Sequence, residues 1–395
     1  MRRRPTKRSL VVAGVGCLLI LVGATAQAGW LFVLAAGVLG LVLGSFVTGH
    51  RLSAVEVSRA GPRRSRVGDE VRVNLVAKSS AASGIPLFVI EDRYPAFEPV
   101  RVAVDRIPPG QGAAIELVRR ASRRGSFSEG PVVLTSGSPF GLARSRRTRI
   151  VHSELTVVPR WVELTSFPIL EPSSSPSDVL HERARTGGGQ EYLGIREYRP
   201  GDPLRSVHWR STARAGRLIV REYEQEIASR VGLVMAGQDH GAGPESAFET
   251  LVSAVASVGL YALSTGHPVH AARMGTDGIE YMGEPGKHDL LDWLASTAPA
   301  DAPMDALVDH MLRRVGRRGT IVICGMSSGT AGGSLGAAVR RAQGAGARAI
   351  VVAARASSWD PRAGEEGAAS GELLGGRAPV RWLVAGEDLV TCLAG

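Results

Sequence analysis

Two long apolar runs open the chain before the pattern of hydrophobic and polar positions changes. Residues 10–26 and 30–47 carry no charged side chain, and only Gln27–Gly29 separate them. Each run is close to the roughly 20 residues that a helix needs to cross a bilayer. We therefore predict that residues 1–51 form a two-helix transmembrane hairpin.

The basic residues around these runs predict how the hairpin is oriented. Residues 1–8 (MRRRPTKR) and the pair His50–Arg51 flank the outer ends, and no basic residue lies between the runs. The positive-inside rule then places both ends in the cytoplasm. This predicts a plasma-membrane protein with two transmembrane helices and soluble domains that face the cytoplasm. Three small residues of the second run are expected to let the helices pack closely, namely Gly37, Gly40 and Gly44.

A secretory signal peptide is the alternative for this region. Ala24–Ala26 and Ala26–Ala28 resemble cleavage sites for such a peptide. A second apolar run follows at once and the chain has no disulfide pattern, so the hairpin is favoured. The three cysteines, Cys17, Cys324 and Cys392, form no CxxC or Cys/His cluster. This indicates a reducing compartment and no zinc site.

From residue 52 to residue 160 the apolar positions alternate with a period of two, which is typical of half-buried strands. Glycine and proline interrupt the alternating runs at the spacing of a β-sandwich. We therefore predict that residues 52–160 form a small β-sandwich domain. Its expected strands include residues 70–76, 86–92, 113–118, 130–134 and 155–159.

A cluster of arginines falls within this β region, at Arg119, Arg120, Arg123 and Arg124. We interpret it as a solvated hairpin end near lipid headgroups. Nucleic-acid binding is the alternative, since clustered basic residues are also typical of such surfaces.

From residue 229 onward strand and helix patterns alternate, which predicts a parallel sheet covered on both faces. Residues 229–395 are therefore expected to form a doubly wound α/β domain. The expected strands are apolar runs at residues 230–235, 268–274, 320–324, 348–353 and 380–384. The expected helices lie at residues 245–265, 287–296, 305–314 and 333–344.

Residues 161–228 are predicted to hold a linker followed by a highly charged segment. Residues 171–189 are rich in Ser, Pro and Gly, which is typical of a linker or mobile loop. Residues 190–226 interleave seven arginines with acidic and aromatic side chains. Two interpretations remain open: an internal lattice of salt bridges that seats the segment on the α/β sheet, or a docking surface for an acidic partner or anion. Guanidinium groups suit both because their planar fork matches a carboxylate.

Local signals predict a turn, a helix and a strand in the charged segment. Residues 199–202 (RPGD) read as a turn, and Asp202 reads as the N-cap of a helix that runs to about Arg214. Gly216 is the expected helix end, and residues 218–223 read as a strand.

One histidine in this segment has the neighbours of a general base. His208 stands beside Trp209 and downstream of Glu197 and Asp202, so one interpretation is a general base with a carboxylate partner. The favoured interpretation is a half-buried packing residue, because no nucleophile or metal cluster accompanies it in the sequence.

The net charge of +10 is only weak evidence for nucleic-acid binding. All but three of the 47 basic residues are arginine, a bias that a GC-rich genome would produce. The excess positive charge concentrates in the first half, where an anionic lipid bilayer is the nearer partner. We therefore expect a contact with lipid and regard nucleic acid as an unlikely partner.

The charged segment resembles the signature of the domain-of-unknown-function 58 family, over about twenty residues. The matching positions are Gly194, Arg196, Glu197, Tyr198, Pro200, Gly201, Asp202, Arg205, Trp209, Arg210, Ala213 and Arg214, with His208 among them. The resemblance implies a membrane-anchored protein that is encoded near MoxR-type AAA ATPases and transglutaminase-like membrane proteins.

The resemblance also implies that residues 229–395 form a von Willebrand factor A-like domain. Such domains often bind a metal through an Asp-x-Ser-x-Ser loop after the first strand, but residues 235–239 here read MAGQD. The oxygen ligands that a hard cation needs are missing, so we expect no metal site and no cofactor. Ser327 and Ser328 would lie at the carboxyl ends of the strands, where such sheets present ligand surfaces.

Together these features predict a membrane-anchored cytoplasmic scaffold or adaptor rather than an enzyme. The family resemblance implies work with a MoxR-type ATPase in assembling or maturing envelope-associated proteins. A hydrolase or transferase that uses the Arg, His and Asp residues of the signature is the first alternative. A membrane-tethered nucleic-acid binder is the second.

Overall fold

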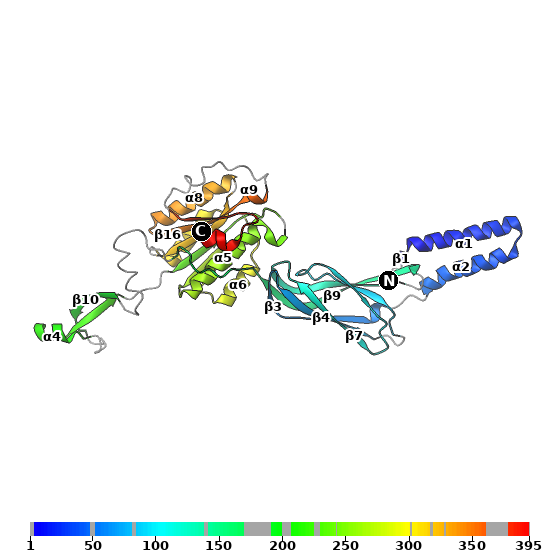
Figure 1. The fold of residues 1–395 in the computed structure, drawn as a ribbon, viewed down its shortest axis with the longest axis horizontal. Coiled ribbons are helices and arrows are strands. Elements are labelled where there is room, and N and C mark those ends of the chain that lie inside the picture. The colour runs from blue at the N-terminus through cyan, green and yellow to red at the C-terminus, as the bar shows by residue number, and fades with distance from the viewer. Residues whose placement is uncertain are drawn as a thin grey trace. The chain divides into compact units, whose positions relative to one another are not determined.

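The computed structural model divides the chain into two compact units (Figure 1). The first covers residues 1–160 with short segments at 242–244 and 291–297, and the second covers the rest. The structure describes residues 4–47, 52–80, 84–137, 141–169, 191–199, 207–224, 230–241, 243–300, 302–316, 319–327, 329–360 and 378–394.

Two apolar helices form a hairpin at the N-terminus, as predicted. Helix α1 (Lys7–Ala26) and helix α2 (Gly29–Val47) lie side by side and are joined by a short turn (Figure 1). Thr6 caps the start of α1, and Gln27 ends it in a left-handed conformation with φ of 51°. The turn therefore falls at the polar interruption that separates the two runs.

The helices meet along small residues of α1, and the predicted glycine contact on α2 is wrong. The buried residues of α1 are Ser9, Gly16 and Gly23, seven apart, so they form one stripe. An added Cβ at Gly16 would lie 2.8 Å from the Leu39 side chain. Gly37, Gly40 and Gly44 have no such neighbour within 4 Å. The rotation of α2 about its own axis turns its glycines away from α1, and the pattern of one helix does not specify that rotation.

The outer surface of the hairpin is apolar. Large exposed side chains on it include Leu10, Leu18, Leu21, Val33 and Leu43. Helix α1 is long and apolar enough to cross a membrane. Helix α5 (Ala247–Ser264) passes the same test, but it is mostly buried, as in a core helix. The apolar part of α2, residues 29–45, is slightly shorter than α1.

Two sheets and the core between them make up the β region of the first unit, in agreement with the predicted sandwich. One sheet has the strand order β2-β4-β7, and the other β1-β9-β8-β5-β6 with β3 beside β9. Their bounds are β1 Arg4–Pro5, β2 Val55–Ala60, β3 Arg64–Arg66, β4 Glu70–Ser79, β5 Phe88–Asp92, β6 Val100–Val104, β7 Gly112–Arg120, β8 Gly125–Gly137 and β9 Ala143–Val158. The core joins Leu75 of β4 to Ile90 of β5 and Leu134 of β8.

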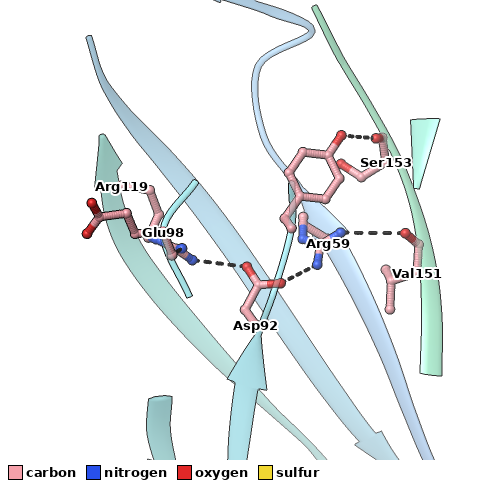
Figure 2. A network of polar contacts seen from close by, with 7 residues as sticks. Arg59, Asp92, Glu98, Arg119, Val151 and Ser153 are labelled. Carbon is pink, nitrogen blue, oxygen red and sulfur yellow. Dashed lines mark hydrogen bonds and ion pairs between the residues drawn. The ribbon is translucent and has the colours of Figure 1, made fainter. Parts of the chain in front are cut away.

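A buried carboxylate links the two sheets. Asp92, at the end of β5, is fully buried and accepts hydrogen bonds from Arg59 of β2 and, at 3.0 Å, from Arg119 of β7 (Figure 2). The Arg59 guanidinium also stacks over the Tyr94 ring at 4.3 Å. Burial lowers the pKa of Arg119, and the Asp92 charge opposes that shift. A buried charge is tolerated only when it is paired in this way.

This contact corrects the interpretation of the arginine cluster. Arg119 is only 6% exposed and belongs to the ion network, so it is not part of a solvated hairpin end. Arg120 and Arg123 are exposed, as expected. The alternation of β7 explains the difference, because successive residues point to opposite faces of a strand.

The second unit contains the expected doubly wound α/β fold. Its sheet has the order β14-β13-β12-β15-β16-β17, with every neighbouring pair parallel except the edge pair β13–β14. The strands are β12 Val231–Met235, β13 Val269–Gly275, β14 Gly278–Gly283, β15 Thr320–Ser327, β16 Arg348–Arg355 and β17 Val380–Leu383. The helices of residues 245–395 are α5, α6 Lys287–Ala295, α7 Met304–Val315, α8 Gly329–Gly344, α9 Ala356–Trp359 and α11 Leu389–Ala394.

Helices cover both faces of this sheet. A Cβ added at Gly232 would collide with Met311 of α7, whereas the next residue of β12, Leu233, lies close to Gly259 of α5. Strand β14 was missed in the sequence, although Asp277–Gly278 is a strong signal for a tight hairpin turn.

Two histidines are held between β13, β14 and α7. His270 Nδ1 lies 2.7 Å from the Tyr281 hydroxyl, and the Tyr281 ring also contacts His310. The buried Nε2 atoms of both histidines have no hydrogen-bond partner among the residues that the structure describes. His270 Nε2 is 4.0 Å from Glu284, which is too far for a hydrogen bond. Burial lowers the pKa of His270, and burial together with nearby arginines lowers the pKa of His310.

The ion network predicts that Asp92→Asn destabilises the β region strongly. The change leaves two buried guanidinium groups without an anion, which costs about 3–5 kcal/mol in comparable networks. Hydrogen exchange of the full chain in detergent, followed by mass spectrometry, should show lost amide protection in β4, β5 and β7. Glu91→Gln on the same strand is the matched control, since Glu91 pairs with the more exposed Arg93 and Arg101. Equal protection in the two variants would contradict a central role for Asp92.

The lowered pKa values of His270 and His310 predict that the second unit loses stability as the pH falls. Their pKa values are depressed in the folded state, so the unfolded chain binds more protons below its ordinary pKa of 6.5. Stability should therefore drop as the pH falls through 6.5 toward the lower folded-state pKa. Thermal unfolding followed by tryptophan fluorescence should show a smaller drop in His270→Gln. The exposed His152→Gln is the control, and an unchanged pH profile in His270→Gln would refute the assignment.

Candidate functional site

The charged signature segment folds into a small module of its own. Strand β10 (Glu191–Glu197) pairs antiparallel with strand β11 (Ile219–Glu224), and helix α4 (Trp209–Ala215) lies between them in the chain. We call residues 191–224 the signature module. Gly194 and Arg196 lie on β10, where a bulge falls between Tyr192 and Gly194.

The helix of the module begins later than predicted. Val207 forms an isolated bridge with Val220, and both side chains are buried at 4% and 1% exposure. The extended backbone at Val207 excludes the continuous helix expected from Asp202, and His208 is the N-cap in its place. The helix ends at Gly216 with φ of 67°, as predicted, and the strand that follows begins at Ile219.

The side chain of His208 is used to cap α4. Its Nδ1 accepts the backbone N–H of Ser211 at 3.2 Å and lies 2.7 Å from the Ser211 hydroxyl. An Nδ1 that accepts hydrogen bonds leaves the proton on Nε2. The sequence interpretation missed Ser211 as a neighbour, although a spacing of three on a helix start brings such side chains together.

The outward surface of α4 combines an aromatic ring with two cations. Trp209 is 67% exposed, and Arg210 and Arg214 are exposed as well. Neither arginine forms an ion pair with a described residue. Their spacing of four places them on the same side of the helix. Ala213, also exposed, adds no side chain that would cover them.

One ion pair of the expected lattice is present in the described part of the module. Arg217 donates to Glu197 at 3.4 Å, and the two side chains are 66% and 63% exposed. A pair so open to water contributes little to stability. Tyr198 is half-buried, and its N–H donates to the Leu218 carbonyl. Four signature positions lie outside the described residues: Pro200, Gly201, Asp202 and Arg205.

Residues at the carboxyl edge of the α/β sheet contact other parts of the same unit. Gly237, after β12, pairs with Ala300, and its Cα packs against the Met326 side chain. The Asp239 carboxylate accepts the N–H of Phe248 at the start of α5, where the helix dipole favours an anion. Ser327 is the last residue of β15, and Ser328 lies outside the described residues.

No group of three or more His, Cys, Asp and Glu that could hold a metal occurs in the part of the chain that the structure describes. Cys324 lies in β15, and burial raises the pKa of its thiol far above the ordinary value. Such a thiol is inert as a nucleophile. The chemistry available to the module is therefore recognition by Trp209 and the arginines, with the His208–Ser211 pair beside them.

No curated protein matches the sequence. Solved structures that resemble parts of the chain include a β-glucosidase from Erythrobacter marinus, at 10% identity and a TM-score of 0.17, over 26% of this chain and 15% of that one. A cycloisomaltooligosaccharide glucanotransferase from Paenibacillus sp. has 10% identity and a TM-score of 0.18, over 83% and 53%. These scores are too low to carry an argument about fold or function.

A comparison with protein families gives a match that includes most of the signature module. Residues 194–356 match the family described as "Protein of unknown function DUF58". The matched range begins on β10, contains α4 and β11, and continues through the sheet to the end of β16. The chain therefore carries a DUF58 domain of unknown function over residues 194–356.

Proposed function

We propose that the protein is a membrane-anchored cytoplasmic scaffold or adaptor that binds an acidic protein partner through its signature module. The apolar hairpin serves as the anchor in the plasma membrane. The partner proposed from the family resemblance is a MoxR-type AAA ATPase, with a transglutaminase-like membrane protein as a second component. The complex would assist the assembly or maturation of envelope-associated proteins.

The exposed surface of α4 is the observation that carries this proposal. Tryptophan and arginine dominate the residues that supply most of the binding energy in protein interfaces. Trp209 presents a large ring to solvent, which costs free energy until a partner covers it. Arg210 and Arg214 beside it form no ion pair with a described residue. An acidic partner would shield the Trp209 ring from water and supply carboxylates that pair with Arg210 and Arg214.

The α/β unit is proposed to be von Willebrand factor A-like. Its strand order reverses between β12 and β15, and an antiparallel strand, β14, forms one edge, which fits a doubly wound sheet. At the reversal, the Asp239 carboxylate accepts the N–H of Phe248, and Gly237 packs on Met326.

The first alternative, a hydrolase or transferase, gains one observation from the structure. The Ser211 hydroxyl lies 2.7 Å from His208 Nδ1, which is the separation of a nucleophile and its base. The same Nδ1 accepts the Ser211 N–H, so helix capping accounts for the contact. Turnover of an ester or amide substrate that His208→Ala abolishes would favour this alternative. Salt-sensitive co-purification of nucleic acid would favour the second alternative, a membrane-tethered nucleic-acid binder.

The docking proposal predicts that the double change Trp209→Ala and Arg210→Ala weakens binding without unfolding the protein. Loss of one such anchor costs about 2 kcal/mol or more, which is roughly a 30-fold weaker Kd. The measurement is the affinity of the full chain in detergent for the purified MoxR-type ATPase of the same organism. Arg340→Ala, an exposed arginine of α8, is the matched control.

Melting temperature separates docking from the lattice interpretation. A surface arginine without an ion pair changes stability by less than about 0.5 kcal/mol, so Arg210→Ala should shift Tm by about 2 °C at most. A large drop in Tm together with unchanged ATPase binding would contradict the docking proposal.

The anchor proposal predicts the side of the membrane on which the soluble units lie. Trypsin added to intact cells should leave the chain whole, because the Arg-containing linker at residues 171–189 faces the cytoplasm. Trypsin added to inside-out membrane vesicles should release the soluble part. Release from intact cells would overturn the orientation and revive the signal-peptide alternative.

A further inference from the structure

A groove lies where the hairpin leaves the β region of the first unit. Its volume is about 530 Å³, within the range of pockets that hold small molecules. The residues that line it come from α1, α2 and the start of the loop into β9, and they are Lys7, Arg8, Val11, Val12, Leu41 and Leu142. The surface of the groove is almost wholly apolar, so Lys7 and Arg8 line it with the methylene groups of their side chains. Both residues are exposed, so an apolar chain in the groove could place an anionic head within reach of their charged ends.

The cationic end lacks a counter-charge. Lys7 and Arg8 are exposed, and neither forms an ion pair with a described residue. Both occupy the first turn of α1, which has no acidic residue. A helix N-terminus carries a partial positive charge, which is repelled by the charges of Lys7 and Arg8. An anion bound at this position would therefore be stabilised.

The walls of the groove are held in place by hydrogen bonds. The Thr6 hydroxyl donates to the carbonyls of Gly141 and Leu142 at 2.8 and 3.1 Å, and the Thr6 N–H donates to Leu142 at 3.2 Å. The same Thr6 caps α1, so the first turn of the helix and the Leu142 wall share one anchor point. A site that is preformed in this way loses little entropy when a ligand binds.

We propose that this groove binds one anionic phospholipid. An acyl chain lies along Val11, Val12 and Leu41, and the headgroup phosphate sits between Lys7 and Arg8. The aliphatic lining selects a lipid over a soluble phosphate, and the two cations select an anionic headgroup over a zwitterionic one. The site rests on the proposed membrane anchor, because it lies at the level where α1 would enter the bilayer.

The test uses the full chain, purified in a mild detergent, and native mass spectrometry. The probes are phosphatidylglycerol and phosphatidylcholine with the same acyl chains, with glycerol 3-phosphate as a soluble competitor. The variants are the double change Lys7→Ala and Arg8→Ala, which removes the cations, and Val12→Trp, which fills the apolar part. The control is the double change Arg72→Ala and Lys78→Ala, which removes two exposed cations from β4.

We expect the wild type and the control to retain phosphatidylglycerol, and both groove variants to retain at least fivefold less. Equal retention of phosphatidylcholine by the wild type, or unchanged retention by Lys7→Ala with Arg8→Ala, would overturn the proposal. Displacement by glycerol 3-phosphate would also overturn it, because the site would then be one for soluble phosphate. Alkaline extraction of the membranes tests the anchor separately: a chain that resists extraction but retains no lipid refutes only the lipid site.

Discussion

A guanidinium group cannot leave water without an acceptor, and this constraint sorts the arginines of the chain into two kinds. Arg59 and Arg119 are buried, and both donate to the carboxylate of Asp92, which thereby ties two sheets together. Arg210 and Arg214 stay in water beside an exposed Trp209. Because almost every basic residue is arginine, charge alone says little about function. Burial and pairing separate the arginines that hold the fold from those that are free to bind.

The proposed anchor is joined directly to the β region. Strand β1 pairs with β9, and Thr6 then starts α1, so the sheet and the hairpin share a continuous backbone connection. The apolar surface of the hairpin and the cations at its base follow the order expected from a bilayer core and its headgroups. A scaffold of the proposed kind would hold the β region close to the membrane and leave the signature module available for a partner.

Periodicity predicted most of the elements but not how they contact one another. The strand–helix alternation located most strands and helices of the α/β region to within a few residues, including β12, α5 and β15. Of β9, the period-two runs found only the end, and they missed β2 and β6. The missed features depend on contacts between distant residues. Val220 holds Val207 in an extended conformation and moves the helix start to His208. Partners across the sheets bury Arg119, and the rotation of α2 turns Gly37 away from α1. The family resemblance located the module, but the exposure of Trp209 required the structure.

The accessibility of the Trp209 ring tests the central claim most directly. Hydroxyl-radical footprinting can compare its oxidation in the purified full chain with its oxidation in native membranes. The half-buried Trp382 of β17 serves as the internal reference. The docking proposal predicts that Trp209 is oxidised faster than Trp382 in the purified chain and is protected severalfold in native membranes. Protection of Trp209 already in the purified chain would contradict it, because the ring would then be packed within the protein itself.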